Sequence, residues 1–102
     1  MRVSTKLNDG TLTVFFDGEL DQSVADSVKN KLDGYLDNAP IRQLVFDMQK
    51  LEFMDSTGIG LIMGRYKKMK AKNVQTFIAN PNKQIEKVIK ISGLYMIIPL
   101  LR

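Results

Sequence analysis

Residues 54–60 read MDSTGIG and stand between an apolar run typical of a strand and a longer run with the apolar spacing of a helix. A glycine inside a helix costs roughly 1 kcal/mol relative to alanine. Gly58, Gly60 and Gly64 nevertheless fall within two turns of this predicted helix. Something other than helix stability must favour glycine here, and we interpret it as close approach of another molecule to the start of the helix.

The composition excludes several classes of function. The 102 residues suffice for one domain, residues 1–102, and include no cysteine and no histidine. Disulfides, thiolate metal sites, and the commonest general base and metal ligand are therefore impossible. No loop has the periodic oxygen pattern that a hard cation requires. We expect no catalytic residue, no metal site and no cofactor, and we do not expect an enzyme.

The sequence carries no signal for export or for a membrane span. The first ten residues lack the apolar core of a signal peptide, and the last apolar run is broken by Pro99 and too short to span a bilayer. We therefore expect a cytoplasmic protein with no membrane partner.

The net charge is +4, much of it in RYKKMKAK at residues 65–72. These cations either complement a helix dipole or form a patch for an acidic protein. No nucleic-acid-binding module is recognised, so no nucleic-acid partner is expected.

Strand signals alternate with helix signals along the chain. Asn8-Asp9-Gly10 is a strong hairpin turn, which predicts antiparallel pairing of residues 3–7 with residues 11–16. Residues 41–48 have a nearly continuous apolar centre, as expected for a strand covered on both faces. Further strands are predicted at residues 74–79 and 94–98.

Three helices are predicted from helical spacing and end signals. The order of elements indicates a single α/β domain with a mixed sheet, in which an N-terminal antiparallel hairpin is followed by parallel strands and helices. The first helix would be capped by Asp21 or Ser23 and would end before Asn38-Ala39-Pro40. The second helix would run from Ser56 or Thr57 to about Lys72. The third helix would start at Asn80-Pro81 and end at Gly93.

The second predicted helix has an unusual outer face. At about 100° per residue, one side gathers a core face of Ile59, Ile62, Met63, Tyr66 and Met69. An outward leucine between glycines on the other side predicts either a shallow docking surface or mere tolerance of glycine. That side carries Thr57, Gly60, Leu61, Gly64 and Lys68.

Asp55, Ser56 and Thr57 permit two interpretations. Each can cap a helix by accepting hydrogen bonds from free backbone N–H groups. A hydroxyl at a helix N-terminus is also a place where a phosphate can be added or held. The strings GxxxxGK[ST] and GxSxG are absent. A dinucleotide fingerprint is disfavoured because Gly58 is placed about ten residues after the predicted strand and the chain is too short for two nucleotide-binding halves.

Three stretches together resemble the anti-sigma factor antagonists of the STAS family, most closely their sporulation members. They are LEFMDSTGIGLIMGRYK at residues 51–67, FDGELD at residues 16–21 and ISGL at residues 91–94. The resemblance covers essentially the whole chain and implies a single STAS domain, residues 1–102. It implies that the unmodified protein binds an anti-sigma factor that is also a serine kinase, and thereby frees a sigma factor for transcription.

The same resemblance implies a phosphorylation switch. Ser56 would be the phosphorylated residue, with Thr57 as a minor rival. The ATP- or ADP-bound kinase would use ATP with magnesium to inactivate the antagonist, and a metal-dependent serine phosphatase would restore it. Asp21 would dock the partner or orient the serine. The expected partner-binding residues are Asp21, Asp55, Ser56, Thr57, Gly58, Gly60, Leu61 and Gly64.

One alternative is a STAS module that binds a nucleotide or another small ligand as a sensor, or that serves as a scaffold subunit. Nucleotide binding by the isolated chain would favour the sensor.

The sequence also departs from the family at one point. Relatives usually continue past the last strand into a further helix, whereas this sequence ends at Arg102, so the resemblance does not indicate how Leu100 and Leu101 are covered.

Overall fold

One mixed sheet forms the centre of the molecule. The computed structural model describes residues 1–38 and 40–101. β1 pairs antiparallel with β2, and the β2–β3 and β3–β4 pairs are parallel, which confirms the predicted sheet. The order across the sheet is β1-β2-β3-β4. The strands are β1 (Arg2–Asn8), β2 (Thr11–Leu20), β3 (Gln43–Met54) and β4 (Gln75–Ala79).

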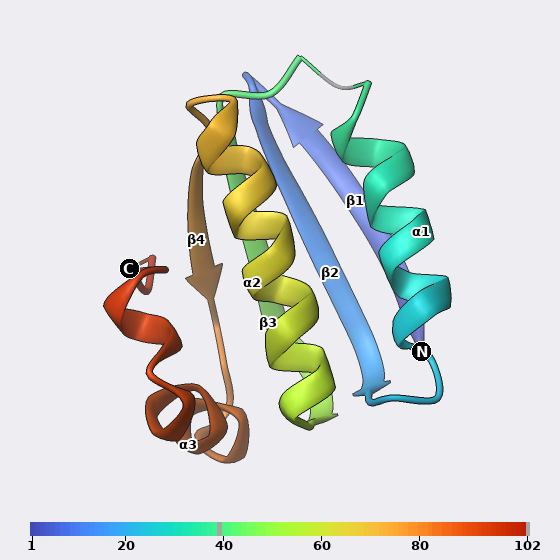
Figure 1. Cartoon of the computed structure of the whole chain (residues 1–102), viewed down its shortest axis with the longest axis vertical. Coiled ribbons are helices and arrows are strands. Elements are labelled where there is room, and N and C mark those ends of the chain that lie inside the picture. The colour runs from blue at the N-terminus through green and yellow to red at the C-terminus, as the bar shows by residue number, and fades with distance from the viewer. Residues whose placement is uncertain (39, 102) are drawn as a thin grey trace.

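The helices cover one face of this sheet. Figure 1 shows α1 and α2 side by side along that face, with α3 beyond the end of β4. The apolar faces of the helices and of the sheet enclose the core, in which the rings of Phe16 and Phe46 stack with centroids 5.8 Å apart. The helices are α1 (Ala25–Leu36), α2 (Ser56–Ala71) and α3 (Lys83–Ser92).

The third strand is longer than the sequence indicated. Its first half pairs with β4 as far as Asp47, and its second half pairs only with β2, where the register is shifted between Phe15 and Asp17 and between Gly18 and Glu19. The second half persists as a strand because Met48, Leu51 and Met54 remain buried. Since β3 ends at Met54, Gly58 follows the strand closely. The prediction that about ten residues separate Gly58 from the strand was therefore wrong, although the chain is still too short for two nucleotide-binding halves.

The predicted cap of the first helix is wrong. Val24 occupies the N-cap of α1 without a side-chain hydrogen bond, and the helix ends at Leu36. Asp21 instead accepts hydrogen bonds from the backbone N–H and the hydroxyl of Ser23, at 2.9 and 2.6 Å. This local turn competes with capping because a short polar side chain can satisfy its own neighbours. Of the predicted stop at residues 38–40, Ala39 lies outside the described residues.

The third helix starts later than predicted. Asn82 is its N-cap and accepts a hydrogen bond from the backbone N–H of Ile85 at 2.9 Å. Asn80 has a φ of 55°, whereas an N-cap needs an extended backbone. Its side chain donates to Asp47 on β3 at 2.9 Å. Gly93 ends α3 with a φ of 77°, as predicted.

The predicted final strand at residues 94–98 is wrong. A 3₁₀ turn, η1 (Leu94–Met96), takes its place. The backbone N–H groups of Ile97 and Ile98 both donate to the carbonyl oxygen of Leu94, which brings Leu94 and Ile98 into the core together. The chain then rejoins the sheet edge through a single bridge between Ile78 and Leu100.

The last two described residues differ in their burial. Leu100 packs against the core, whereas Leu101 is 40% exposed.

Candidate functional site

Asp55 fixes the start of α2 to the end of β2. Its Oδ1 accepts a hydrogen bond from the backbone N–H of Gly58 at 3.0 Å, and its Oδ2 accepts one from the backbone N–H of Gln22 at 3.3 Å. The backbone N–H of Asp55 donates to the carbonyl oxygen of Leu20 at 3.4 Å. The N-cap that the sequence left open among three residues is therefore Asp55, and capping does not require the Ser56 hydroxyl.

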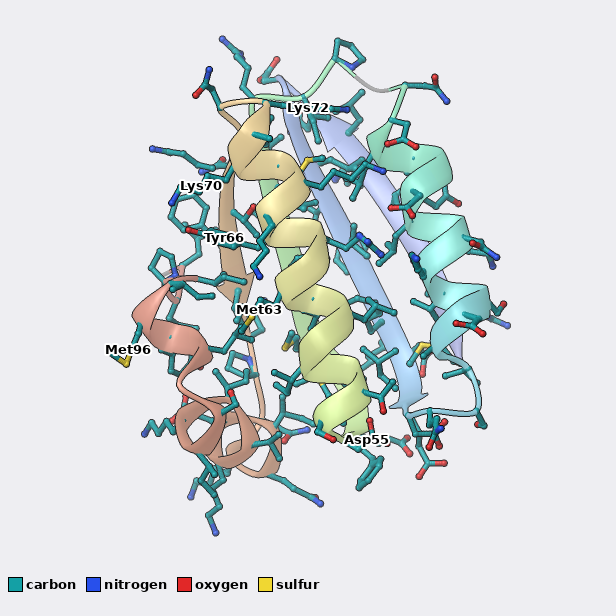
Figure 2. All side chains as sticks on the ribbon, in the orientation of Figure 1. Asp55, Met63, Tyr66, Lys70, Lys72 and Met96 are labelled. Carbon is teal, nitrogen blue, oxygen red and sulfur yellow. The ribbon has the colours of Figure 1, made fainter. Side chains whose placement is uncertain are left out.

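Ser56 is the first residue of α2 and is exposed, whereas Thr57 is partly buried. Beside Ser56 lies a groove of about 320 Å³ between α2 and α3, lined also by Ile59, Val88 and Ile91. Ile91 is 88% exposed. Figure 2 shows Asp55 at the end of α2 that lies beside α3. The serine hydroxyl therefore stands next to an exposed apolar wall.

A single polar contact helps to place α3 beside Ser56. The side-chain amide of Asn82 donates to the carbonyl oxygen of Leu51 on β3 at 2.9 Å. The contribution of Val88 and Ile91 to this site was not predicted from the sequence. The available signal was Ile91, an isoleucine that is off helical register with the buried residues Ile85 and Ile89.

Asp21 lies in the loop that follows β2, at the edge where Asp55 also stands. Leu20 pairs with Met54, so the residues that follow each of them leave the sheet at the same end. The hydrogen bond from the Ser23 hydroxyl lowers the pKa of the Asp21 carboxyl below its usual value. Two carboxylates thus stand at the same end of the sheet, near the first turn of α2.

Gly58 does not leave space for a visiting backbone. It is buried, and a Cβ added there would lie 2.6 Å from Cγ of Met54 and 2.8 Å from the carbonyl oxygen of Leu20. Our interpretation of this glycine as an access point was wrong, because it is the close packing of α2 on the end of β2 that requires it. At Gly60 and Gly64 an added Cβ would meet no described atom within 4 Å beyond the backbone of α2 itself.

The predicted outward position of Leu61 is also wrong. Leu61 is 8% exposed and belongs to the core, because α1 packs along this flank of α2. A groove of about 280 Å³ remains between the two helices, which we call the α1–α2 groove. Its walls include Thr57 and Gly60 from α2, and Ala25 and Lys29 from α1.

Ion pairs join the C-terminal halves of α1 and α2. Nζ of Lys68 lies 3.2 Å from Oδ1 of Asp33 and also pairs with Asp37. The hydrogen bond from Lys68 lowers the pKa of the Asp37 carboxyl, and the hydrogen bond to Asp37 raises the pKa of the Lys68 ammonium. The pair therefore stabilises the fold above the unfolded-state pKa of aspartate, and it stops doing so as the pH falls through the lowered pKa.

This pair predicts a pH-dependent variant. Lys68→Met should have a lower Tm than the wild type at pH 7, and the difference should shrink in acid as the pH falls through the lowered pKa of Asp37. Thermal unfolding followed by circular dichroism over this pH range tests it, with Lys67→Met, at an exposed neighbouring position, as the control. A difference that persists undiminished in acid would show that Lys68 acts through packing of its stem instead.

Metal-binding clusters and membrane-spanning helices are both absent from the described residues. Among the described residues, no group of three histidine, cysteine, aspartate or glutamate side chains is placed to hold a metal ion. Within the same residues, no helix has both the length and the apolar composition that a membrane span requires.

Comparison with known proteins places this geometry in context. The sequence profile of the STAS domain matches residues 2–102. The anti-sigma F factor antagonist of Paenibacillus polymyxa is 30% identical over 100 residues, which are 98% of this chain and 86% of that protein. The anti-sigma-B factor antagonist of Listeria monocytogenes is 28% identical over 89 residues, which are 87% of this chain and 77% of that protein.

Solved structures share the fold. The anti-sigma factor antagonist SpoIIAA in its unphosphorylated form matches with a TM-score of 0.83 at 24% identity, over 99% of this chain and 89% of that one. The Bacillus cell fate determinant SpoIIAA in its phosphorylated form matches with a TM-score of 0.74 at 24% identity, over 99% and 92%.

Proposed function

Because the chain belongs to the STAS domain family, we propose that it is an anti-sigma factor antagonist that binds an anti-sigma factor and so frees a sigma factor. The names of the curated relatives, anti-sigma F and anti-sigma-B factor antagonists, support this function. The anti-sigma factor would also be a serine kinase that uses ATP, and a metal-dependent serine phosphatase would reverse its action. The chain itself would have no catalytic role.

The observation that carries the proposal is the exposed hydroxyl of Ser56 at the start of α2, beside the apolar groove that Ile91 borders. A kinase needs an accessible hydroxyl, and a protein partner needs apolar surface to bury. Both are present at one point of the surface. Ser56 suits the role of acceptor better than Thr57, because Thr57 is partly buried against the α1–α2 groove.

A phosphate on Ser56 would act through charge rather than through unfolding. It would bring a charge of about −1.5 to −2 to a helix N-terminus, which favours an anion by roughly 0.3–1 kcal/mol. At a separation of about 6 Å from a carboxylate such as Asp55, each unit of negative charge is repelled by about 0.7 kcal/mol in water and about 3 kcal/mol at an effective dielectric constant of 20. A docked partner excludes water, so the same phosphate should be tolerated in the free protein and costly in the complex.

Mass spectrometry after incubation with the kinase and ATP tests the proposal. We expect a single added phosphate in the wild type and in Thr57→Val, and none in Ser56→Ala. Peptide mapping should place the phosphate on Ser56. Full incorporation of phosphate into Ser56→Ala would show that another residue is the acceptor. A wild-type chain that neither binds nor is modified by any anti-sigma factor kinase would refute the proposed function.

A further inference from the structure

The α1–α2 groove carries positive charge that the fold leaves partly unused. Arg65 projects from α2 toward α1, and its Nε lies 3.2 Å from Oδ1 of Asp33. Lys68 holds that same oxygen by a hydrogen bond at 3.2 Å. Nε of Arg65 meets its acceptor only as this ion pair with Asp33, without hydrogen-bond geometry, and Nη1 is buried with no hydrogen-bond partner among the described residues. A buried guanidinium donor without an acceptor is costly, so Nη1 favours an acceptor that arrives from outside.

The groove is open where such an acceptor would enter. Arg65 lines it together with Lys29 of α1, which is exposed, and Gly60 of α2, above which no side chain stands. Thr57, the residue that follows Ser56, lines its other end. The groove is therefore continuous with the surface on which the partner would dock.

We infer that the α1–α2 groove receives a carboxylate side chain of the anti-sigma factor, which binds the Arg65 guanidinium with Lys29 beside it. This inference rests on the proposed function and adds the chemistry of a second contact. A carboxylate matches the planar fork of an arginine and can accept two parallel hydrogen bonds. Asp26 also lines the groove, and its charge opposes a dianionic phosphate more than a single carboxylate.

Matched variants on α1 test the inference. Lys29→Glu places a negative charge in the groove, and Lys31→Glu makes the same change on the other flank of the helix, where Lys31 borders Met1 and Val3. Isothermal titration calorimetry against an anti-sigma factor kinase that binds the wild type should show about tenfold weaker binding for Lys29→Glu and less than about twofold for Lys31→Glu. The gap should narrow between about 50 mM and about 300 mM NaCl, because salt screens exposed charges.

Two variants at Arg65 complete the experiment. Arg65→Gln should weaken binding about 30-fold, and Arg65→Lys should restore little of it, since an ammonium cannot replace a bidentate fork. Thermal unfolding of each variant checks folding. If Arg65→Gln does not fold, the comparison of Lys29→Glu with Lys31→Glu still tests whether the groove binds the partner.

The possible outcomes separate this inference from the function on which it rests. Equal weakening by Lys29→Glu and Lys31→Glu, with wild-type binding intact, overturns the inference and leaves the proposed function standing. Failure of the wild type to bind overturns both. A saturable shift of the Arg65 Nε resonance on titration of the isolated chain with inorganic phosphate would assign the groove to a small anion and also overturn the inference.

Discussion

Gly58→Ala is expected to destabilise the protein by about 2 kcal/mol. Its added Cβ would lie 2.8 Å from the backbone carbonyl oxygen of Leu20, which cannot rotate away, and 2.6 Å from Cγ of Met54. Overpacking costs about 1–3 kcal/mol, occasionally more, and a contact below 3 Å with a backbone atom places Gly58→Ala at the upper end of this range. The gain in helix propensity of about 1 kcal/mol then leaves a net loss of about 2 kcal/mol. Denaturant unfolding should record the loss, and Tm should fall by about 10 °C.

Gly60→Ala is the matched control, with the opposite sign. Gly60 lies in the same helix, and an added Cβ there would occupy open space. We expect a gain of about 0.5–1 kcal/mol from helix propensity alone. If the two substitutions change stability in the same direction, close packing on the end of β2 is not what requires glycine at position 58.

Ser56→Asp is expected to weaken binding of the anti-sigma factor by about 100-fold, whereas Ser56→Ala should bind within about threefold of the wild type. The aspartate places a fixed charge beside Asp55 in a surface that the partner would dehydrate, whereas alanine only removes a hydroxyl. Calorimetry with the purified anti-sigma factor measures the difference. Circular dichroism should show that both variants remain folded, because a negative charge is favourable at the exposed N-terminus of α2.

Ser27→Asp controls for the change in net charge. Ser27 is exposed on α1 and borders the cleft near Met1, away from Ser56. It should bind like the wild type. Equal affinities of Ser56→Asp and Ser56→Ala would show that charge at this position does not control the contact, and the switch would then need another mechanism.

Local signals account for the elements that were predicted well. The turn at Asp9 and Gly10, both with positive φ, forms the β1–β2 hairpin, and Gly93 ends α3 in the left-handed conformation. These features depend on one or two residues and their own backbone, so they can be predicted without knowing which distant residues pack against them. The alternation of strands and helices likewise predicted the mixed sheet.

Predictions that depended on a distant neighbour failed. Leu61 was placed outward because the helical period alone does not show that α1 packs on that flank, and Gly58 was interpreted as an opening because Leu20 is far away in the sequence. The late start of α3 has the same cause, since Asn82 both caps the helix and bonds the carbonyl of Leu51.

The class of fold, the order of most elements and the position of Ser56 at the head of a helix follow from the sequence alone. Which hydroxyl is exposed, which glycine is buried, and which apolar residue of α3 lies beside the serine depend on how the elements pack. The difference between the two groups of features follows from how far apart in the sequence the interacting residues lie. Turns and helical periods are set by residues a few positions apart, whereas burial and close approach depend on segments that only folding brings together.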